Sequence, residues 1–266
     1  MPEYNLPPKL IDIHNHTWKG MDEPAFLALM DELHIETMLM MGAGLDGMAN
    51  ERVHSVMGRH PGRFVGGCYL DPRDGRQAVA EMRHWCSEGM RVVKLFPNFG
   101  YSPDDDALRP FFDAVAGCKM AVLSHCGWLA PSPGMGYASY YATPGRFEKL
   151  IRLYPETIFI MAHMGGINGF LESIMLTTRT PNTYVDCSPG QGTWVLEHAW
   201  PMVCTIPPER LMWGADCMTL RETLARNRAA LEARGFGPHF EKIFYGNARG
   251  ILERIGALPV ARAACP

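Results

Sequence analysis

The stretch IDIHNHTWKG (residues 11–20) decides between two α/β folds. A short apolar run ends in two histidines, His14 and His16, and Gly20 and Pro24 indicate that the strand has stopped. An open, doubly wound sheet places a glycine-rich phosphate turn after its first strand, and HNHTWKG is not such a turn. Residues i and i+2 of a strand face the same side, so both imidazoles are expected to point the same way. The stretch therefore favours a parallel barrel over an open sheet.

Eight short apolar segments alternate with amphipathic ones along the chain. We expect strands at residues 9–14, 36–43, 63–70, 91–96, 120–125, 158–163, 183–188 and 210–216. Helical patterns stand between them, such as EPAFLALMDEL (23–33) and LRETLARNRAALEA (220–233), and the weakest is TWVLEHAWPMV (193–203). No linker or repeat divides the 266 residues, and a (β/α)8 barrel needs about 250. The sequence therefore predicts a single (β/α)8 TIM-barrel domain over residues 1–266.

Composition narrows the class of partner. Hydrophobic residues make up 47% of the chain and charged residues 20%, which is the balance of a globular protein with a core. The net charge is −3, without a basic cluster, which argues against nucleic acid and anionic membranes as partners. The first residues, MPEYNLPPKL, lack the pattern of a signal peptide, and we expect a cytoplasmic protein. Eight scattered cysteines without a CxxC pair are then expected to be reduced thiols, most of them buried.

Polar residues stand where several predicted strands end. They are His14 and His16 on the first strand, Lys94 on the fourth, His125 on the fifth, His163 on the sixth and Asp216 on the eighth. The carboxyl ends of barrel strands form one rim, where catalytic groups gather. Neutral imidazole and carboxylate suit a borderline cation such as Zn²⁺, bound by three or four protein ligands with one position open. The pattern predicts a metal centre at this rim, and the other six histidines are expected to be structural.

Several motifs together resemble a known family. They are IDIHNH, EGMRVVKLFPN, MAVLSHCG, YPETIFIMAHMGG, YVDCS, ERLMWGADC and KIFYGNARGIL, spread over roughly residues 10–255. This ordered set resembles the amidohydrolase superfamily, in the branch called amidohydrolase family 2 that includes aminocarboxymuconate-semialdehyde decarboxylase. The resemblance implies a metal-dependent barrel enzyme. It does not imply one reaction, because the family includes hydrolases, lactonases, decarboxylases and hydratases.

The resemblance also implies roles for single residues. His14, His16, His125 and Asp216 become the metal ligands, and His163 becomes the catalytic histidine, with Asp216 also holding a proton of the metal-activated water. In two-metal relatives a carboxylated lysine on the fourth strand bridges the ions, and Lys94 stands at that place. His163 would then join a second ion. The flanking motifs match the one-metal branch better, so we expect one divalent ion, zinc, with two ions and a carboxylated Lys94 as the alternative.

Substrate specificity is expected in the loops that follow the strands. The loop at residues 126–143 is long and carries Trp128, Tyr137, Tyr140 and Tyr141. It is either a lid over a flat or apolar substrate or a segment packed on the barrel or on a second subunit, which leaves a homo-oligomer open. We predict that Lys94, Trp128 and Tyr137 bind a small-molecule substrate.

Basic residues in these loops are few, namely Lys19, Arg73 and Arg221, so a polyanionic substrate is disfavoured. The sequence favours hydrolysis of an amide, ester or lactone of a small cyclic or aromatic compound. The alternative is metal-dependent, non-oxidative decarboxylation of a small aromatic or unsaturated acid. Some decarboxylases of the resembling branch carry glutamate at the first HxH position, and His14 departs from them. A metal-free, non-catalytic barrel is a third reading, and the complete set of ligand types argues against it.

Overall fold

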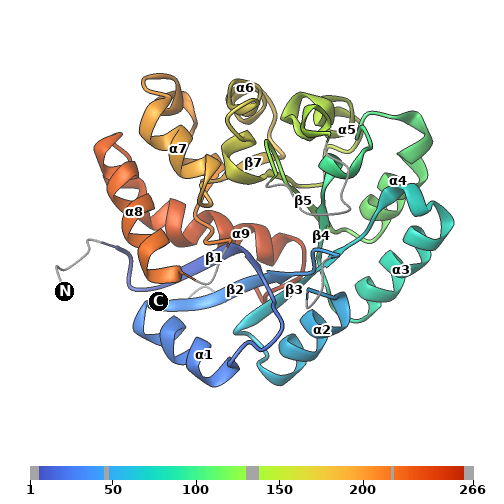
Figure 1. Cartoon of the computed structure of the whole chain (residues 1–266), viewed down its shortest axis with the longest axis horizontal. Helices are drawn as coiled ribbons and strands as arrows, with labels where there is room; N and C mark the ends of the chain where they lie inside the picture. Colours follow the sequence, from blue (N-terminus) through green and yellow to red (C-terminus); the bar gives the residue numbers. More distant parts are fainter. Residues whose placement is uncertain (1–5, 45–47, 130–137, 217–218, 261–266) are drawn as a thin grey trace.

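The fold is a barrel of eight parallel strands surrounded by helices (Figure 1). The computed structural model describes residues 6–44, 48–129, 138–216 and 219–260. Consecutive strands pair in parallel throughout, in the order β1 to β8. The strands are β1 (Leu10–His16), β2 (Ile35–Met41), β3 (Phe64–Tyr69), β4 (Val92–Leu95), β5 (Ala121–Ser124), β6 (Phe159–Met161), β7 (Thr183–Asp186) and β8 (Leu211–Met212). The predicted (β/α)8 barrel is confirmed, with a strand inside or overlapping every predicted segment.

A helix follows each strand, and one further helix lies near the end of the described chain. The helices are α1 (Glu23–Glu32), α2 (Asn50–Arg59), α3 (Arg76–Ser87), α4 (Arg109–Gly117), α5 (Glu148–Leu153), α6 (Phe170–Arg179), α7 (Gln191–His198), α8 (Leu220–Ala233) and α9 (Asn247–Arg254). A side-chain cap fixes the start of α1, where the Asp22 side chain accepts a hydrogen bond from Ala25 N at 3.0 Å. Within the described part of the chain, no helix is both long and apolar enough to span a bilayer.

The core has an inner and an outer layer because strand side chains alternate. Along β4, Val92 belongs to the inner layer and Val93 to the outer layer, which packs against the surrounding helices. Ile251 and Leu252 of α9 also join the inner layer. Burying each such aliphatic side chain stabilises the fold by about 1.5–3 kcal/mol. The apolar interior leaves the carboxyl ends of the strands as the place for polar groups.

The barrel closes where β8 meets β1, and here the structure differs from the expected strand at 210–216. Strand pairing ends at Met212, but the following residues still run beside β1. Ile13 N donates to Trp213 O at 3.2 Å, and Asp216 N donates to His14 O at 2.6 Å. At Asp216 the backbone has φ 46°, outside the strand region, so the regular strand cannot continue.

Two features fix this seam. Oδ1 of the buried Asp12 accepts hydrogen bonds from His14 N and Ala215 N, both at 3.0 Å, and so ties β1 to the segment after β8. Gly214 allows the close approach, because a Cβ at this position would lie 2.7 Å from the His14 Cβ. The seam therefore fixes the spacing between His14 and Asp216.

Candidate metal and active site

Three predicted ligands meet at the carboxyl end of β1 and β8. His14 Nε2 and His16 Nε2 each lie 3.2 Å from the same oxygen, Asp216 Oδ1. One ligand atom from each residue lies within 4.8 Å of the other two. The His14 side chain is completely buried, whereas those of His16 and Asp216 are 13% and 22% exposed. These three residues could hold a metal ion with one side open to a substrate.

His163 and His125 extend this cluster towards β5 and β6. His163 Nε2 lies 3.6 Å from Asp216 Oδ2 and 3.2 Å from His125 Nδ1. Both imidazoles are buried. The structure thus brings all five of these residues together, although His125 reaches the carboxylate through His163 rather than directly. Their division into ligands and catalyst stays a prediction.

Hydrogen bonds to fixed acceptors define which ring nitrogens of three histidines carry a proton. Their partners are a carboxylate oxygen and two backbone carbonyls, which accept but cannot donate. The contacts are His14 Nδ1 to Asp186 Oδ2 at 2.9 Å, His16 Nδ1 to Met41 O at 3.1 Å and His125 Nε2 to Trp128 O at 3.2 Å. The opposite nitrogens, Nε2 of His14, Nε2 of His16 and Nδ1 of His125, therefore carry lone pairs.

The lone pairs of His14 and His16 converge on the Asp216 carboxylate, which is an arrangement that calls for a cation. Two imidazole lone pairs and a carboxylate oxygen at 3.2 Å repel one another unless positive charge lies between them. Lys94 supplies one cation, with Nζ 2.7 Å from His14 Nε2. Imidazole nitrogen and carboxylate oxygen are also the donor set that a borderline divalent ion prefers. The residues present thus fit a metal ion.

Burial sets the protonation of the cluster. It lowers the pKa of His14 and His125, and it lowers the pKa of His163 to about 4, so these imidazoles are neutral at neutral pH. Burial likewise lowers the pKa of Lys94 to about 8, against the pull of nearby carboxylates. Burial would raise the pKa of Asp216, but its neighbours His14 and His16 hold that pKa well below its usual range. Neutral imidazoles and an ionised carboxylate are the forms that bind a metal ion.

Two residues of the site, Asp186 and Ser188, were not predicted. Asp186 lies at the end of β7 and is fully buried. Its Oδ2 accepts from His14 Nδ1, and its Oδ1 accepts from His163 N and Ser188 N, each at 3.0 Å. The Ser188 hydroxyl lies 2.8 Å from His163 Nδ1. The motif YVDCS carried this signal, as two polar residues at the end of a strand.

A strained turn orients His163. The backbone has φ 56° at His163 and 55° at Met164, the left-handed region that costs non-glycine residues of order 1–3 kcal/mol. The hydrogen bond from His163 N to Asp186 holds this turn in place. Gly192 packs against it, since a Cβ there would lie 3.1 Å from the His163 Cα. The turn also ends β6 at Met161, earlier than the expected 158–163.

The predicted substrate-binding residues fall in different places. Lys94 is buried at the centre of the site. The Trp128 side chain is 65% exposed, while its backbone is held by Gln191, which donates to Trp128 O at 2.6 Å and accepts from Trp128 N at 2.9 Å. Tyr137 lies outside the described residues. An exposed Trp128 side chain is free to contact a bound substrate. Its role in substrate binding stays a prediction.

Aromatic rings line the β3 and β4 side of the site. The Phe96 ring stacks on His125 with centroids 5.6 Å apart and on Phe99 at 5.2 Å. Tyr69 packs against both phenylalanines. Lys94 Nζ lies 4.9 Å from the Phe96 centroid. This run of flat rings begins in direct contact with a predicted metal ligand.

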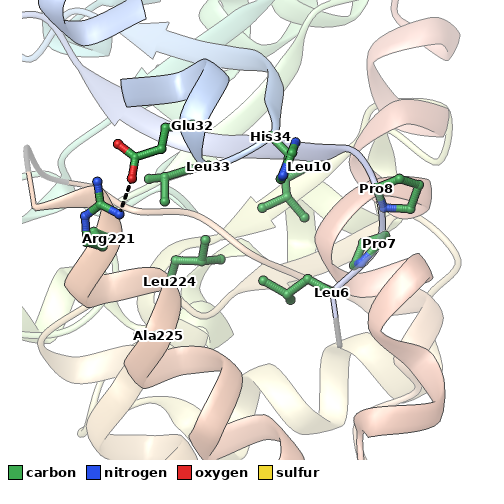
Figure 2. A pocket seen from close by; sticks show the side chains of 10 residues that line it. All are labelled: Leu6, Pro7, Pro8, Leu10, Glu32, Leu33, His34, Arg221, Leu224 and Ala225. Atoms are coloured by element: carbon green, nitrogen blue, oxygen red, sulfur yellow. Dashed lines mark ion pairs between the residues drawn. The ribbon is translucent and has the colours of Figure 1, made fainter. Parts of the chain in front are cut away.

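A separate pocket of about 460 Å³ lies against α1 and α8, on the outside of the barrel (Figure 2). Its wall is mostly apolar and includes Leu33 and Leu224, and Arg221 pairs with Glu32 there at 2.6 Å. None of the predicted site residues lines it. We expected Arg221 in a loop at the rim. Its side chain instead forms an ion pair with Glu32 on the outer surface of the barrel.

Comparison with known proteins agrees with the barrel fold and identifies the family. The family model with the description amidohydrolase matches residues 11–254 of this chain. A search of curated proteins gave no significant match. Among solved structures, an uncharacterized TIM-barrel protein from Bordetella bronchiseptica is 18% identical, with a TM-score of 0.72 over 93% of this chain and 99% of the other.

Two further solved structures show the range of chemistry on this fold. A probable 2-pyrone-4,6-dicarboxylic acid hydrolase from Acinetobacter baumannii is 14% identical, with a TM-score of 0.65 over 93% of this chain and 99% of the other. A 5-carboxyvanillate decarboxylase from Novosphingobium aromaticivorans, with bound manganese, is 14% identical, with a TM-score of 0.60 over 92% and 97%. At these identities the likeness shows the fold alone. The match of the family model over residues 11–254, on a barrel whose rim carries the expected histidines and aspartate, shows that the chain belongs to the amidohydrolase family.

Proposed function

We propose that this protein is a metal-dependent hydrolase that acts on an amide, ester or lactone of a small cyclic or aromatic compound. The observation that carries the proposal is the convergence of the His14 and His16 lone pairs on the Asp216 carboxylate, with the ring N–H groups of both histidines directed away from it. Such a centre is built to hold a cation rather than to close a hydrogen-bond network.

The proposed ligands are His14, His16, His125 and Asp216, around one zinc ion. When bound, a divalent ion supplies an acidified water and an electrophile for a carbonyl oxygen. The partly exposed side chains of His16 and Asp216 leave the open side towards solvent, where a substrate enters. Nitrogen and oxygen donors suit zinc, and manganese is the metal named for the decarboxylase structure.

The chain's own residues would handle the proton. Asp216 Oδ2 lies 3.6 Å from His163 Nε2, so an attacking water beside this pair would contact both groups. His163 is neutral at neutral pH and can accept the proton of that water. It can then return the proton to the leaving oxygen or nitrogen of the substrate, as general acid–base catalysis requires.

The walls of the site favour a flat, weakly charged substrate. The run of Tyr69, Phe99 and Phe96 offers ring faces next to His125. Arg73 pairs with Asp71, as Arg221 pairs with Glu32, so these two guanidinium groups are already neutralised. A substrate with several carboxylates would find few partners.

Decarboxylation is the second candidate, and Lys94 is the observation that favours it. Its ammonium lies at the centre of the site and could pair with one substrate carboxylate. A screen of lactones, esters, amides and aromatic acids separates the two reactions. Release of carbon dioxide without consumption of any ester, lactone or amide would replace the hydrolase proposal.

Metal stoichiometry tests the division of roles. We expect about one zinc per chain in the wild type, and the same content in His163→Asn and Lys94→Met. Loss of the proton acceptor in His163→Asn should reduce activity by roughly 10²–10⁴. About two ions per chain, falling to one or less in both variants, would instead indicate a binuclear site bridged by carboxylated Lys94. Wild-type protein that binds no divalent metal would overturn the proposal.

A further inference from the structure

The side-chain amide of Gln191, the first residue of α7, contacts both backbone polar groups of Trp128. Its Nε2 donates to Trp128 O at 2.6 Å, and its Oε1 accepts from Trp128 N at 2.9 Å. These two contacts define the orientation of the amide, because a backbone N–H requires an acceptor and a backbone carbonyl requires a donor. The Gln191 amide therefore holds the backbone of Trp128 at two points.

The place of the Trp128 indole depends mainly on this backbone contact. The side chain is 65% exposed, so packing around the ring restrains it little. The backbone sets the direction of the Cα–Cβ bond, and that backbone is held by Gln191 and by His125, whose Nε2 lies 3.2 Å from Trp128 O. Loss of the Gln191 amide would remove two of these three contacts and leave the indole without a fixed direction.

Gln191 also fixes Trp128 relative to the turn that carries His163. Gln191 Oε1 accepts a second hydrogen bond, from Ile167 N in the segment after β6, at 3.3 Å. The next residue of α7, Gly192, packs against the His163 turn, since a Cβ there would lie 3.1 Å from the His163 Cα. Two consecutive residues of α7 thus contact the segment of Trp128 and the turn of the proposed catalyst.

Glycine at position 127 admits the Gln191 amide. The backbone of Gly127 has φ 88°, the left-handed region that favours glycine. A Cβ at this position would lie 2.3 Å from Gln191 Oε1 and 2.7 Å from the Gly166 Cα. A larger residue here would push the amide away from the backbone of Trp128. The segment before Trp128 is therefore shaped to receive Gln191.

We propose that Gln191 is a positioning residue that places the Trp128 indole at the mouth of the site, where it contacts the substrate. Gln191 acts through Trp128 and does not itself touch the substrate. The inference rests on the proposed function, in which a small cyclic or aromatic compound binds beside the metal ligands. A flat ring is a shape that an indole recognises by stacking.

The first experiment observes Trp128 directly, by ¹⁹F NMR of the full chain labelled with 5-fluorotryptophan. The chain has six tryptophans, and Trp128→Phe identifies the signal of Trp128 by its loss. We expect a single Trp128 signal in the wild type, and a shifted or divided one in Gln191→Ala and Gln191→Glu. Glutamate keeps the size and the acceptor for Trp128 N but places an oxygen against Trp128 O. The control is Gln77→Ala, which removes an exposed amide that donates to Glu81 Oε1 at 2.9 Å within α3.

The second experiment measures hydrolysis of 4-nitrophenyl acetate, a small aromatic ester of the proposed class, by the zinc-loaded protein. Gln191→Ala should raise KM by roughly 2–10-fold, the worth of one aromatic stacking contact. The value of kcat should stay within about twofold, because the contact binds the substrate and its transition state alike. In a Trp128→Ala background, Gln191→Ala should leave KM unchanged, because Gln191 acts on the substrate only through Trp128.

The results separate this inference from the proposed function. A wild-type Trp128 signal in Gln191→Ala or Gln191→Glu, or an equal change of that signal in Gln77→Ala, would overturn the positioning role. An unchanged KM in Gln191→Ala, or an increase in KM that persists without the Trp128 indole, would overturn the contact with substrate. Zinc-loaded wild type that does not hydrolyse the ester would count against the proposed function, while the ¹⁹F spectra still decide whether Gln191 holds Trp128.

Discussion

Replacement of Asp186 by asparagine should weaken zinc binding although Asp186 is not a predicted ligand. Both carboxylate oxygens are in use, Oδ2 by His14 Nδ1 at 2.9 Å and Oδ1 by His163 N and Ser188 N at 3.0 Å. Asparagine keeps one oxygen and presents an NH₂ group in place of the other. If the oxygen keeps the two backbone contacts, the NH₂ group faces His14 Nδ1–H, donor against donor. His14 then moves its proton to Nε2 and loses the lone pair that the metal requires.

The expected loss follows from this change of tautomer. Removal of a carboxylate that orients a metal-bound histidine usually weakens metal affinity by about 10–100-fold. That range corresponds to about 1.4–2.7 kcal/mol of binding free energy. Competition between the protein and a chromogenic zinc chelator measures the dissociation constant, and far-ultraviolet circular dichroism checks that the variant folds.

A matched control isolates the effect. Asp113→Asn removes another carboxylate that accepts a hydrogen bond, from the Tyr154 hydroxyl at 2.7 Å, on the exposed surface. We expect its zinc affinity to equal that of the wild type. A folded Asp186→Asn variant that binds zinc within twofold of the wild type would show that His14 does not depend on this carboxylate.

Three other predictions address the loop, the seam and the metal. Trp128→Ala should change KM or kcat while metal content and melting temperature stay constant; loss of folding would favour a packing role for the loop. Gly214→Ala should destabilise the fold by about 1–3 kcal/mol, because its Cβ would overlap His14, whereas Gly250→Ala, which meets nothing within 4 Å, should not. Chelation of zinc present at 100 times its dissociation constant should remove about 2.7 kcal/mol and lower the melting temperature by roughly 5–11 °C; an unchanged thermogram would contradict a resident ion.

Local patterns explain how much of the architecture could be read from the sequence. Apolar runs of strand length and intervening amphipathic stretches are properties of neighbouring residues, so they located all eight strands and the barrel. Their ends were less certain, because tertiary contacts decide them. The strand predicted at 210–216 keeps regular pairing only at Leu211–Met212, since Asp216 must leave the strand conformation to approach His14 and His16.

The sequence by itself determined that histidines and an aspartate stand at strand ends, and barrel geometry then implied their convergence. Only the tertiary structure decided which ring nitrogen of each residue faces inward, because the outward acceptors come from other segments: Asp186 lies 172 residues from His14 and Met41 lies 25 residues from His16. The pairing of Ser188 with His163 likewise joins β7 to β6. A linear pattern records residue types and spacing, whereas hydrogen-bond direction depends on which groups the fold brings into contact.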